Sequence, residues 1–577
     1  MKRTDLMTIV KNRYILIIII VVTMSVAIQQ SAKALSTKDA YRGLAQGPVL
    51  NTRYFFPDDP YFSNQWHLDH LTRPDANVVS AWGNGYTGAG VTIGIVDDSL
   101  QHNHPDLSPN YVAADSFDFG QNDGDPSPVY TDDNHGTSVA GVAAARGGNA
   151  LGVTGAAPEA GLAGLRIDFP NQTTQMFVDA TLYHSSGANT NIKVKNHSYG
   201  ISAPYIDSTP EVNALKTSAG AGTIHVFAAG NERDDHGLWS GGGGDGDANK
   251  KHMQSVQETI AVAALGWNGT FASYSNWGAN VFVTAPSSGS GVGITTTDRT
   301  GNDGYNSAGS GDGDSFADTN YTSIFGGTSS AAPLVSGIMA LSKQANDNLD
   351  VRMAKHLLAM TSVIVDEFDA TETSDGGWTP NAAGYKFNQN YGFGLINADA
   401  FVTQAKLFGG VSPLVTETTG LITVGSAILD AIANNVTPST LSRQFSLSTS
   451  GMLEEIEIDL GITHTWRGDL QATLTSPWGT TSRLMYRNIT DSINNLDWTF
   501  TTNAFWGENP VGDWTLTLED WFSFDTGIWD SFSVLAKTGN LFTPVPEPST
   551  IVLFGIGLAG IGSRYLWRRQ KQRRVGA

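Results

Sequence analysis

Cysteine is absent from this chain of 577 residues, which excludes disulfide bonds, thiol catalysis and cysteine-ligated metal sites. Positive charge is also scarce: 34 lysines and arginines are outnumbered by 55 aspartates and glutamates, and the formal net charge is −21. Because such a chain repels phosphate backbones, we expect no nucleic-acid partner. The hydrophobic content of 40% is sufficient for two or three domains that each bury a core.

Apolar segments flanked by basic residues lie at both ends of the chain. The first, Ile15–Ile28, follows a basic stretch and precedes Ala32-Lys33-Ala34, which has the small-residue pattern that signal peptidase accepts. The run is short for a membrane span, so we predict a cleaved signal peptide over residues 1–34 rather than an anchor. A short lead segment, 35–58, follows it, and the protein is expected to be exported.

The second apolar segment, Ile551–Gly562, lies between Val545-Pro-Glu-Pro-Ser-Thr550 and an arginine-rich tail. Under the positive-inside rule the tail stays cytoplasmic and the preceding chain is outside. This order resembles the PEP-CTERM sorting signal of Gram-negative bacteria. For residues 545–577 the resemblance implies a short transmembrane segment, transient anchoring in the inner membrane, cleavage by a dedicated membrane protease, and release or attachment at the cell surface. An ordinary C-terminal anchor would use the same residues.

The composition changes once between the two ends. In the first part, short β-branched runs such as Val91–Val96 alternate with Gly- and Ala-rich helical stretches, which predicts an α/β domain with a parallel sheet. From about residue 410 to 537, short alternating strands such as Leu453–Leu460 predict an all-β module. The Gly-, Ser- and Asp-rich segment Ser287–Asp318 is predicted to be a surface loop.

Four polar residues of the α/β part lie in patterns that each suit one task of a hydrolytic site. Asp97 ends a predicted strand, where a carboxylate can orient a histidine, and His135 begins a small-residue helix and has the pKa range of a general base. Asn231 also ends a strand and can donate its amide N–H to an oxyanion. Ser329 begins a predicted helix, which brings its hydroxyl and backbone N–H together at the helix N-terminus.

The chain order Asp, His, Asn, Ser resembles that of subtilisin-like serine proteases and differs from the orders of chymotrypsin and the α/β-hydrolases. The resemblance implies a subtilisin-like parallel-sheet catalytic domain. It also implies that Asp97 orients His135, which acts as base and then as acid for the nucleophile Ser329. Asn231 and the backbone N–H of Ser329 would bind the oxyanion.

Flanking motifs narrow the resemblance to the kexin/furin branch. Asp59-Pro-Tyr-Phe-Ser-Asn-Gln-Trp66 resembles the mature start of that branch, and Tyr391-Gly-Phe-Gly-Leu-Ile-Asn-Ala398 resembles the end of its catalytic domain. Thr463-His-Thr-Trp-Arg-Gly-Asp-Leu470 resembles part of the P domain of these convertases. The implied architecture is a catalytic domain over 59–408 followed by a jelly-roll-like P domain, a β-sandwich, over 411–540.

The segment His102-x-His104-x-Asp106 has a spacing that can bind zinc. The family resemblance explains the same loop differently, because Asp106 matches a ligand of a structural calcium ion. Carboxylate and amide oxygens suit Ca²⁺. At a second calcium site of the family Asn276 replaces a glutamate, so we expect one ion. The other ligands that the resemblance implies are Asp59, the side chain of Asn149, and backbone carbonyls near Arg146, Leu151 and Val153.

The expected substrate-binding residues only partly match those of the kexin/furin branch. Asp98 matches the acid that faces the substrate residue preceding the scissile one. The acid of the first pocket, however, falls near Ala203, so cleavage after arginine or lysine is in doubt. Asp245 or Asp247 are candidates to restore negative charge to that pocket. The predicted substrate strand includes Ser198, Tyr199 and Gly200.

The leading hypothesis is an exported, calcium-stabilised serine endopeptidase that acts on proteins or peptides. Its processing partners would be signal peptidase and the PEP-CTERM-processing membrane protease. The alternative is a catalytically idle surface-adhesion or matrix-binding protein that uses its β domain. An esterase or amidase with the same residues is a third hypothesis, but the extended substrate segment favours a peptide that adds a strand. The lead segment 35–58 is shorter than the inhibitory prodomain of the resembled family, which leaves the maturation route open.

Overall fold

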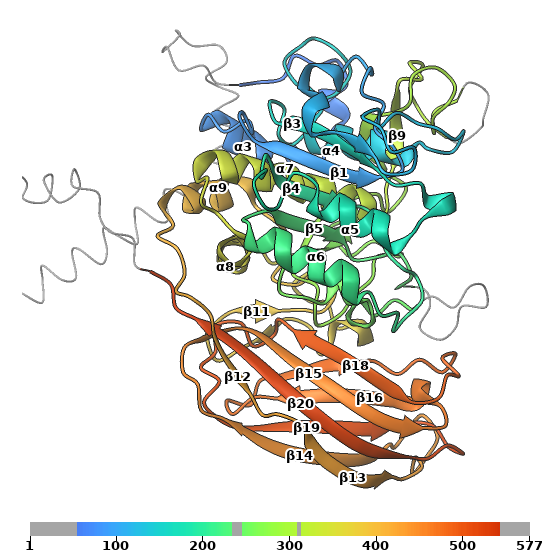
Figure 1. Cartoon of the computed structure of the whole chain (residues 1–577), viewed down its shortest axis with the longest axis vertical. Helices are drawn as coiled ribbons and strands as arrows, with labels where there is room; N and C mark the ends of the chain where they lie inside the picture. The colour runs from blue at the N-terminus through green and yellow to red at the C-terminus, as the bar shows by residue number, and fades with distance from the viewer. Residues whose placement is uncertain (1–54, 234–244, 308–312, 543–577) are drawn as a thin grey trace, which may run out of the picture.

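The structure is a computed structural model and describes residues 55–233, 245–307 and 313–542. Figure 1 shows an α/β body and, below it, a β-rich body formed by the C-terminal part of the described chain. The predicted signal peptide (1–34), most of the lead segment (35–58) and the predicted sorting signal (545–577) lie outside the described residues. Within the described ranges, no helix is both long and apolar enough to cross a membrane.

A seven-stranded sheet forms the centre of the α/β body, in the order β2-β3-β1-β4-β5-β6-β7. Each neighbouring pair in this order is parallel. The central strands are buried along almost their whole length, as expected for a parallel sheet with helices on both faces. The predicted α/β domain is thereby confirmed. The strands are β1 (Thr92–Asp97), β2 (Phe117–Asp118), β3 (Gly161–Arg166), β4 (Ile192–His197), β5 (Ile224–Ala228), β6 (Thr259–Leu265) and β7 (Val283–Pro286).

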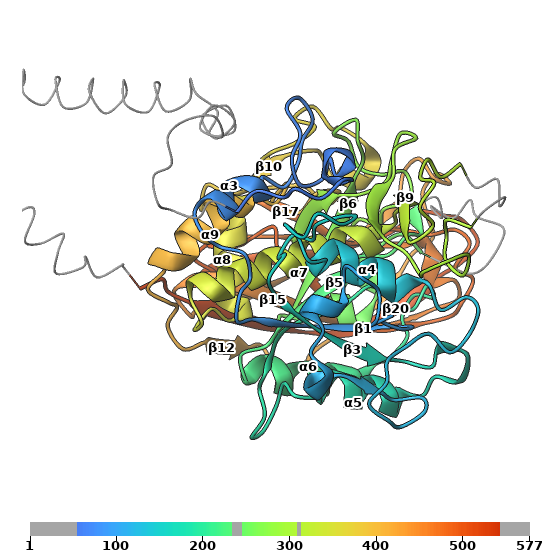
Figure 2. The same ribbon diagram turned by 90° about the horizontal axis from the view of Figure 1, so that it is seen from above.

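Helices cover both faces of this sheet, as Figure 2 shows. On one face, α5 (Thr174–Leu182) packs against α6 (Thr209–Gly220), and on the other α4 (His135–Ala144) packs against α7 (Thr328–Ala345). Short polar residues fix some of the helix starts; the side chain of Thr173, for example, accepts a backbone N–H of the first turn of α5. The other α-helices of the described chain are α3 (Val78–Gly83), α8 (Val351–Thr361) and α9 (Ala398–Leu407).

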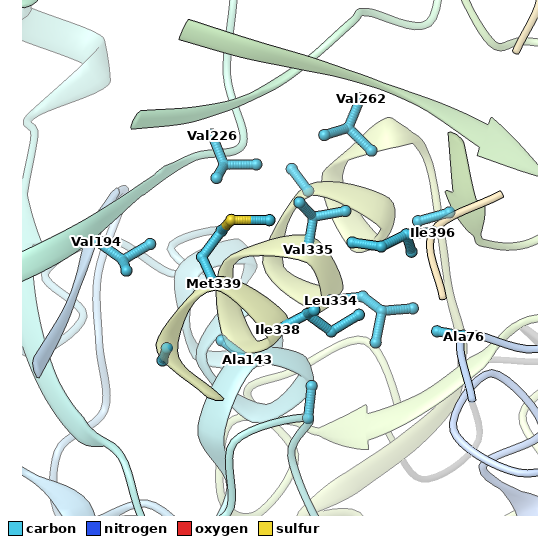
Figure 3. Close-up of a cluster of buried hydrophobic side chains, with 14 of the residues drawn as sticks. Ala76, Ala143, Val194, Val226, Val262, Leu334, Val335, Ile338, Met339 and Ile396 are labelled. Carbon is cyan, nitrogen blue, oxygen red and sulfur yellow. The ribbon is translucent and has the colours of Figure 1, made fainter. Parts of the chain in front are cut away.

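The helix α7 lies in the core and is buried from Thr328 to Lys343. In Figure 3, Val335 and Met339 of this helix point toward valines of β4, β5 and β6. On the other side, α7 approaches α4 so closely that a Cβ at Gly337 would lie 2.7 Å from the carbonyl oxygen of Ala143. Small residues at this crossing therefore allow the two helices that carry the candidate site to pack directly on each other.

The segment Ser287–Asp318, predicted as a surface loop, contains regular structure. Residues Ile294–Thr297 form β8, which is completely buried and pairs antiparallel with β9, Tyr321–Phe325. The loop prediction is wrong for β8, because the glycines and aspartates flanking this short β-branched run dominate the composition of the segment. A second short hairpin of this body consists of β10 (Thr379–Pro380) and β11 (Lys386–Phe387).

Two antiparallel sheets form the β-rich body. One has the order β12-β20-β15-β18, with β13 also paired to β20, and the other has the order β14-β19-β16-β17. Buried and partly exposed residues alternate along β16, and inward-facing side chains of both sheets share one core. The all-β prediction is confirmed. The strands are β12 (Val415–Thr418), β13 (Ile422–Ile428), β14 (Ser439–Leu447), β15 (Met452–His464), β16 (Leu470–Thr475), β17 (Thr481–Met485), β18 (Leu496–Thr502), β19 (Gly512–Asp520) and β20 (Gly527–Gly539).

The two bodies are joined by buried contacts. Asn249 is fully buried, and its side-chain amide donates to the carbonyls of Leu484 and Thr501 in the β-rich body at 2.8 Å each. Trp506 follows β18 and is 2% exposed, yet it belongs to the hydrophobic core of the α/β body. Its ring lies edge-on to Phe282, with the ring centroids 5.2 Å apart. The α/β core is therefore completed by a side chain from the β-rich body.

We expect Trp506→Ala to lower the free energy of unfolding by about 3–5 kcal/mol, because it leaves a cavity in the α/β core. Urea unfolding followed by circular dichroism measures this change. Trp478→Ala is the matched control: Trp478 is also in the β-rich body but is 57% exposed, and its loss should cost less than about 1 kcal/mol. Equal costs for the two variants would contradict the proposed packing role of Trp506.

Candidate active site

Asp97 and His135 are hydrogen-bonded where β1 ends and α4 begins. Asp97 is the last residue of β1 and His135 the first residue of α4. The distance between Asp97 Oδ1 and His135 Nδ1 is 2.8 Å. Gly136 is required by this close approach, because a Cβ there would lie 1.9 Å from the carbonyl oxygen of Ser99. With Nδ1 engaged, Nε2 is the nitrogen of His135 that is left to accept a proton.

Asp98 lies at the N-terminus of α4, and both carboxylates act on the histidine. Asp98 accepts the backbone N–H groups of His135 and Gly136 at 2.9 and 2.8 Å, a favourable position for a negative charge. Burial and the charge of Asp97 raise the pKa of Asp98 to about 7. Burial lowers the pKa of His135, but the charge and hydrogen bond of Asp97 and the charge of Asp98 outweigh it and raise that pKa to about 9.

Ser329 lies in the first turn of α7. Gly327 precedes this helix with φ of 73°, a conformation that favours glycine. Pro333 lacks a backbone N–H, so it cannot donate to the carbonyl of Ser329, four residues earlier in the helix. The hydroxyl of Ser198 donates to this carbonyl instead, at 3.0 Å. The Ser329 hydroxyl donates to the carbonyl of Ser198 at 3.2 Å, rather than to His135. The two serines therefore join the end of β4 to the start of α7.

Asn231 follows β5 and is oriented by the residue before Ser329. Its side-chain Oδ1 accepts the backbone N–H of Thr328 at 2.8 Å and the Thr328 hydroxyl at 3.0 Å. Because a backbone N–H can only donate, the oxygen of the amide must face Thr328, which directs the amide nitrogen elsewhere. The Nδ2 group thus remains a donor beside the first turn of α7.

A cavity of about 210 Å³ opens beside Ser329. The predicted substrate residues Ser198, Tyr199 and Gly200 line this cavity together with Asn231. The structure therefore brings the predicted nucleophile, the predicted oxyanion donor and the predicted substrate strand to one cavity. Further lining residues that were not predicted are Ile201, Ser202, Ala228, Ala229, Gly230, Glu232, Lys251, Gln254 and Thr328.

The first-pocket candidates Asp245 and Asp247 lie elsewhere. Asp245 forms an ion pair with Lys250 at 2.7 Å and accepts the side-chain amide of Asn488 in the β-rich body. Asp247 accepts the backbone N–H of Tyr486. The suggestion that they restore negative charge to the pocket is therefore wrong, because both stabilise the contact between the two bodies.

Asp59, Asp106 and Asn149 lie together, as the predicted calcium site requires. Asp59 accepts the backbone N–H of Gly148 at 2.8 Å, and Asp106 accepts the side-chain amide of Asn149 at 2.9 Å. Asp106 is fully buried, and burial raises its pKa to about 6. Two carboxylates, one amide and the nearby backbone are a donor set that fits Ca²⁺, once the amide of Asn149 turns its oxygen toward Asp106. The carbonyl ligands predicted near Arg146, Leu151 and Val153 belong to the same loop.

The zinc hypothesis does not fit the geometry. His102 stacks on Tyr111, and its Nε2 lies 3.3 Å from Asp125. His104 is buried, and its Nε2 lies 3.0 Å from the carbonyl oxygen of Asn320. The two imidazoles therefore have separate partners. In the part of the chain that the structure describes, no group of three or more His, Cys, Asp or Glu side chains is arranged to hold a metal.

Residues 88–394 match the model of the subtilase family. The chain belongs to the subtilase family. Residues 453–535 match the proprotein convertase P-domain, and residues 544–570 match the PEP-CTERM protein-sorting motif. The resemblances drawn from the sequence motifs are thus confirmed at the level of family and domain, and the β-rich body is a P domain.

Several convertases are similar to this subtilase. Furin-1 of Xenopus laevis is 31% identical over 81% of this chain and 57% of its own length, and neuroendocrine convertase 2 of Drosophila melanogaster is 32% identical over 80% and 69%. The chain thus spans between half and about two thirds of these relatives. The solved serine protease of Aeromonas sobria is 28% identical, with a TM-score of 0.74 over 85% of this chain and 98% of that chain.

We expect His135 to titrate with a pKa near 9, which NMR of its imidazole resonances measures. Asp98→Asn should lower this pKa, because the charge of Asp98 favours the imidazolium. The folded pKa exceeds the ordinary value of 6.5, so the ionised histidine contributes stability below pH 6.5 that is lost as the pH rises through about 9. A pKa at or below 6.5 would contradict the arrangement of the two carboxylates.

Proposed function

We propose that this subtilase is an exported, calcium-stabilised serine endopeptidase. The single observation that carries the proposal is the 2.8 Å hydrogen bond between Asp97 and His135, in a site where Ser329 begins a buried helix beside Asn231. A carboxylate, an imidazole and a hydroxyl in this chain order are the parts of a catalytic triad. The convertases and the bacterial protease to which the chain is similar support a peptide substrate.

In the first half of the reaction, the Ser329 hydroxyl turns from Ser198 toward His135. Its oxygen attacks the carbonyl carbon of the scissile bond while Nε2 of the neutral form of His135, which becomes populated as the pH rises toward 9, takes the proton. Asp97 stabilises the imidazolium that results. The negative charge that develops on the former carbonyl oxygen is bound by the Asn231 amide and by the Ser329 N–H, which belongs to a helix start and has no intrahelical acceptor.

In the second half, the tetrahedral intermediate collapses. The C–N bond breaks, and His135 gives its proton to the leaving amine, so the first product departs and an ester to Ser329 remains. Water then attacks this ester with His135 again as base, and the carboxylic acid product and the free hydroxyl are restored. The segment Ser198–Gly200 follows β4 and lines the cavity, which supports a peptide over a small ester, because a peptide backbone can pair with such a segment as an added strand.

Calcium would be held by Asp59, Asp106 and Asn149, with carbonyls of the loop from Arg146 to Val153. When bound, the ion supplies positive charge for two neighbouring carboxylates, one of them fully buried. These residues tie the N-terminal segment of the described chain to the loop that follows α4. The proposed role is therefore structural, at a distance from the reacting groups.

The proposed location is the outside of the inner membrane of a Gram-negative bacterium. The match of residues 544–570 to the PEP-CTERM motif supports export and sorting, and the basic N-terminus supports entry through a signal peptide. Signal peptidase and a PEP-CTERM-processing membrane protease would then be its processing partners, and anchoring would be transient. The protein would finally be attached to the cell surface or released.

We expect Ser329→Ala to abolish cleavage of a proteome-derived peptide library, with a loss in kcat of about 10⁶. Asn231→Ala keeps the nucleophile and removes one oxyanion donor, so kcat should fall by about 10²–10³. Mass spectrometry of the products measures both. The control is Ser330→Ala, from the same turn of α7, and this variant should still cleave the peptide library. A folded Ser329→Ala protein with wild-type cleavage or full biological effect would contradict the proposal and favour a binding protein.

Removing calcium with a chelator should lower the melting temperature of the wild-type protein by roughly 3–4 °C, if the ion is present at about 100 times its Kd. The Asp106→Asn variant should melt at the temperature of the calcium-free wild-type protein whether or not calcium is added, because the buried ligand has lost its charge. Differential scanning calorimetry measures the shifts. Asp125→Asn, an exposed aspartate of the same region, is the control and should keep the response to calcium. A wild-type protein that does not respond to chelation would contradict the proposed site.

A further inference from the structure

The cavity beside Ser329 has two charged residues in its lining, Lys251 and Glu232. Its walls are formed by Ser198–Ser202 and by Ala228–Asn231, so it lies where the side chain of the substrate residue whose carbonyl is attacked (P1) would enter. The charge on the lining therefore decides which P1 side chain is accepted. This inference rests on the proposed endopeptidase function.

Lys251 and its neighbour Lys250 have different partners. Lys250 is paired with Asp245 at 2.7 Å and also donates to the carbonyl of Tyr486, so its charge is matched at the contact with the P domain. Lys251 is 4% exposed and lines the cavity. Within the described residues its Nζ donates to the carbonyl of Ser202 and forms no ion pair within 4.0 Å. Two of its three N–H donors therefore remain for a ligand. Burial lowers the pKa of Lys251, and the more distant charges of Glu232, Asp245 and Asp247 oppose that shift.

Glu232, which lines the same cavity, is hydrogen-bonded to its neighbours. Its Oε2 accepts the side-chain amide of Asn276 at 2.7 Å and the backbone N–H of Asn231 at 3.1 Å. The backbone N–H of Glu232 in turn donates to Asn276 at 2.6 Å. The carboxylate thus accepts two hydrogen bonds, from Asn276 and Asn231, and both reach Oε2, so this oxygen is already engaged.

Other parts of the cavity also favour an acceptor over a cation. The side-chain amide of Gln254 lies close to Gly200, since a Cβ built on that glycine would be 2.9 Å from Nε2. Gln254 is 4% exposed, and its Nε2 has one long contact, 3.4 Å to the carbonyl of Ala228. The lining therefore holds an ammonium and an amide donor beside one carboxylate, Glu232, whose Oε2 is already hydrogen-bonded.

We propose that the first pocket recognises an acidic P1 side chain, glutamate or aspartate, through the ammonium of Lys251. A carboxylate in the cavity replaces the solvent around a nearly buried cation and accepts its remaining N–H donors, with Gln254 as a second donor. A P1 arginine or lysine would bring a like charge to the same cation. Charge-assisted hydrogen bonds of this kind correspond to a preference of roughly ten- to a hundredfold.

The test uses the purified protein and a peptide library in which the P1 residue is varied. We expect kcat/KM to be at least about tenfold higher for glutamate or aspartate than for arginine. Lys251→Met should remove this preference, Lys251→Glu should reverse it toward arginine and lysine, and Lys251→Arg should retain it. Glu232→Gln, which removes the other charge of the lining, should keep the acidic preference.

A fluorophosphonate probe that labels a reactive serine separates the two hypotheses. If the wild-type protein is labelled at Ser329 but cleaves best after arginine or lysine, or if Lys251→Met leaves the P1 profile unchanged, the inference is overturned while the proposed function stands. If folded wild-type protein is neither labelled nor active on any peptide, the proposed function fails and the inference fails with it. Labelling together with cleavage after acidic residues supports both.

Discussion

The burial of α7 is the constraint on which the rest of the catalytic domain depends. This helix contacts β4, β5, β6 and β7 as well as α4 and α9, and it is buried over most of its length. Because it cannot shift without disturbing all of these elements, Ser329 in its first turn has a defined position relative to the strand ends. The same packing brings α4 alongside and fixes His135 relative to α7. Precision at the site is thus a property of the core.

Part of the fold was predictable because the central strands β1, β5 and β6 are short, mainly apolar runs bounded by turn residues. The strand at Val91–Val96 was placed within one residue of β1, and the order of Asp97, His135, Asn231 and Ser329 already indicated the family. The strand β8 was missed because its four residues are flanked by a long Gly- and Asp-rich composition. The composition of the whole segment predicted a loop, and the partner strand that stabilises β8, β9, lies more than twenty residues later in the chain.

The contents of the first pocket were not predictable, and the reason is physical. Lys250 and Lys251 are adjacent and identical in type, yet one is paired with Asp245 and the other faces the cavity. Which lysine does which depends on where the P domain supplies acceptors, such as the carbonyl of Tyr486. No local pattern encodes a contact between residues separated by more than two hundred positions. The same holds for Asp245 and Asp247, which were candidates for the pocket and belong to the contact with the P domain.

Trp506 has a consequence for the biosynthesis of the protein. The ribosome delivers every predicted catalytic residue well before this tryptophan, yet the hydrophobic core around Phe282 contains its ring. Until the segment around residue 506 has folded against it, the α/β core therefore contains a hole. A chain truncated before residue 506 carries all the reacting groups on an incompletely packed scaffold. Complete packing of the α/β core is thus coupled to the folding of the P domain.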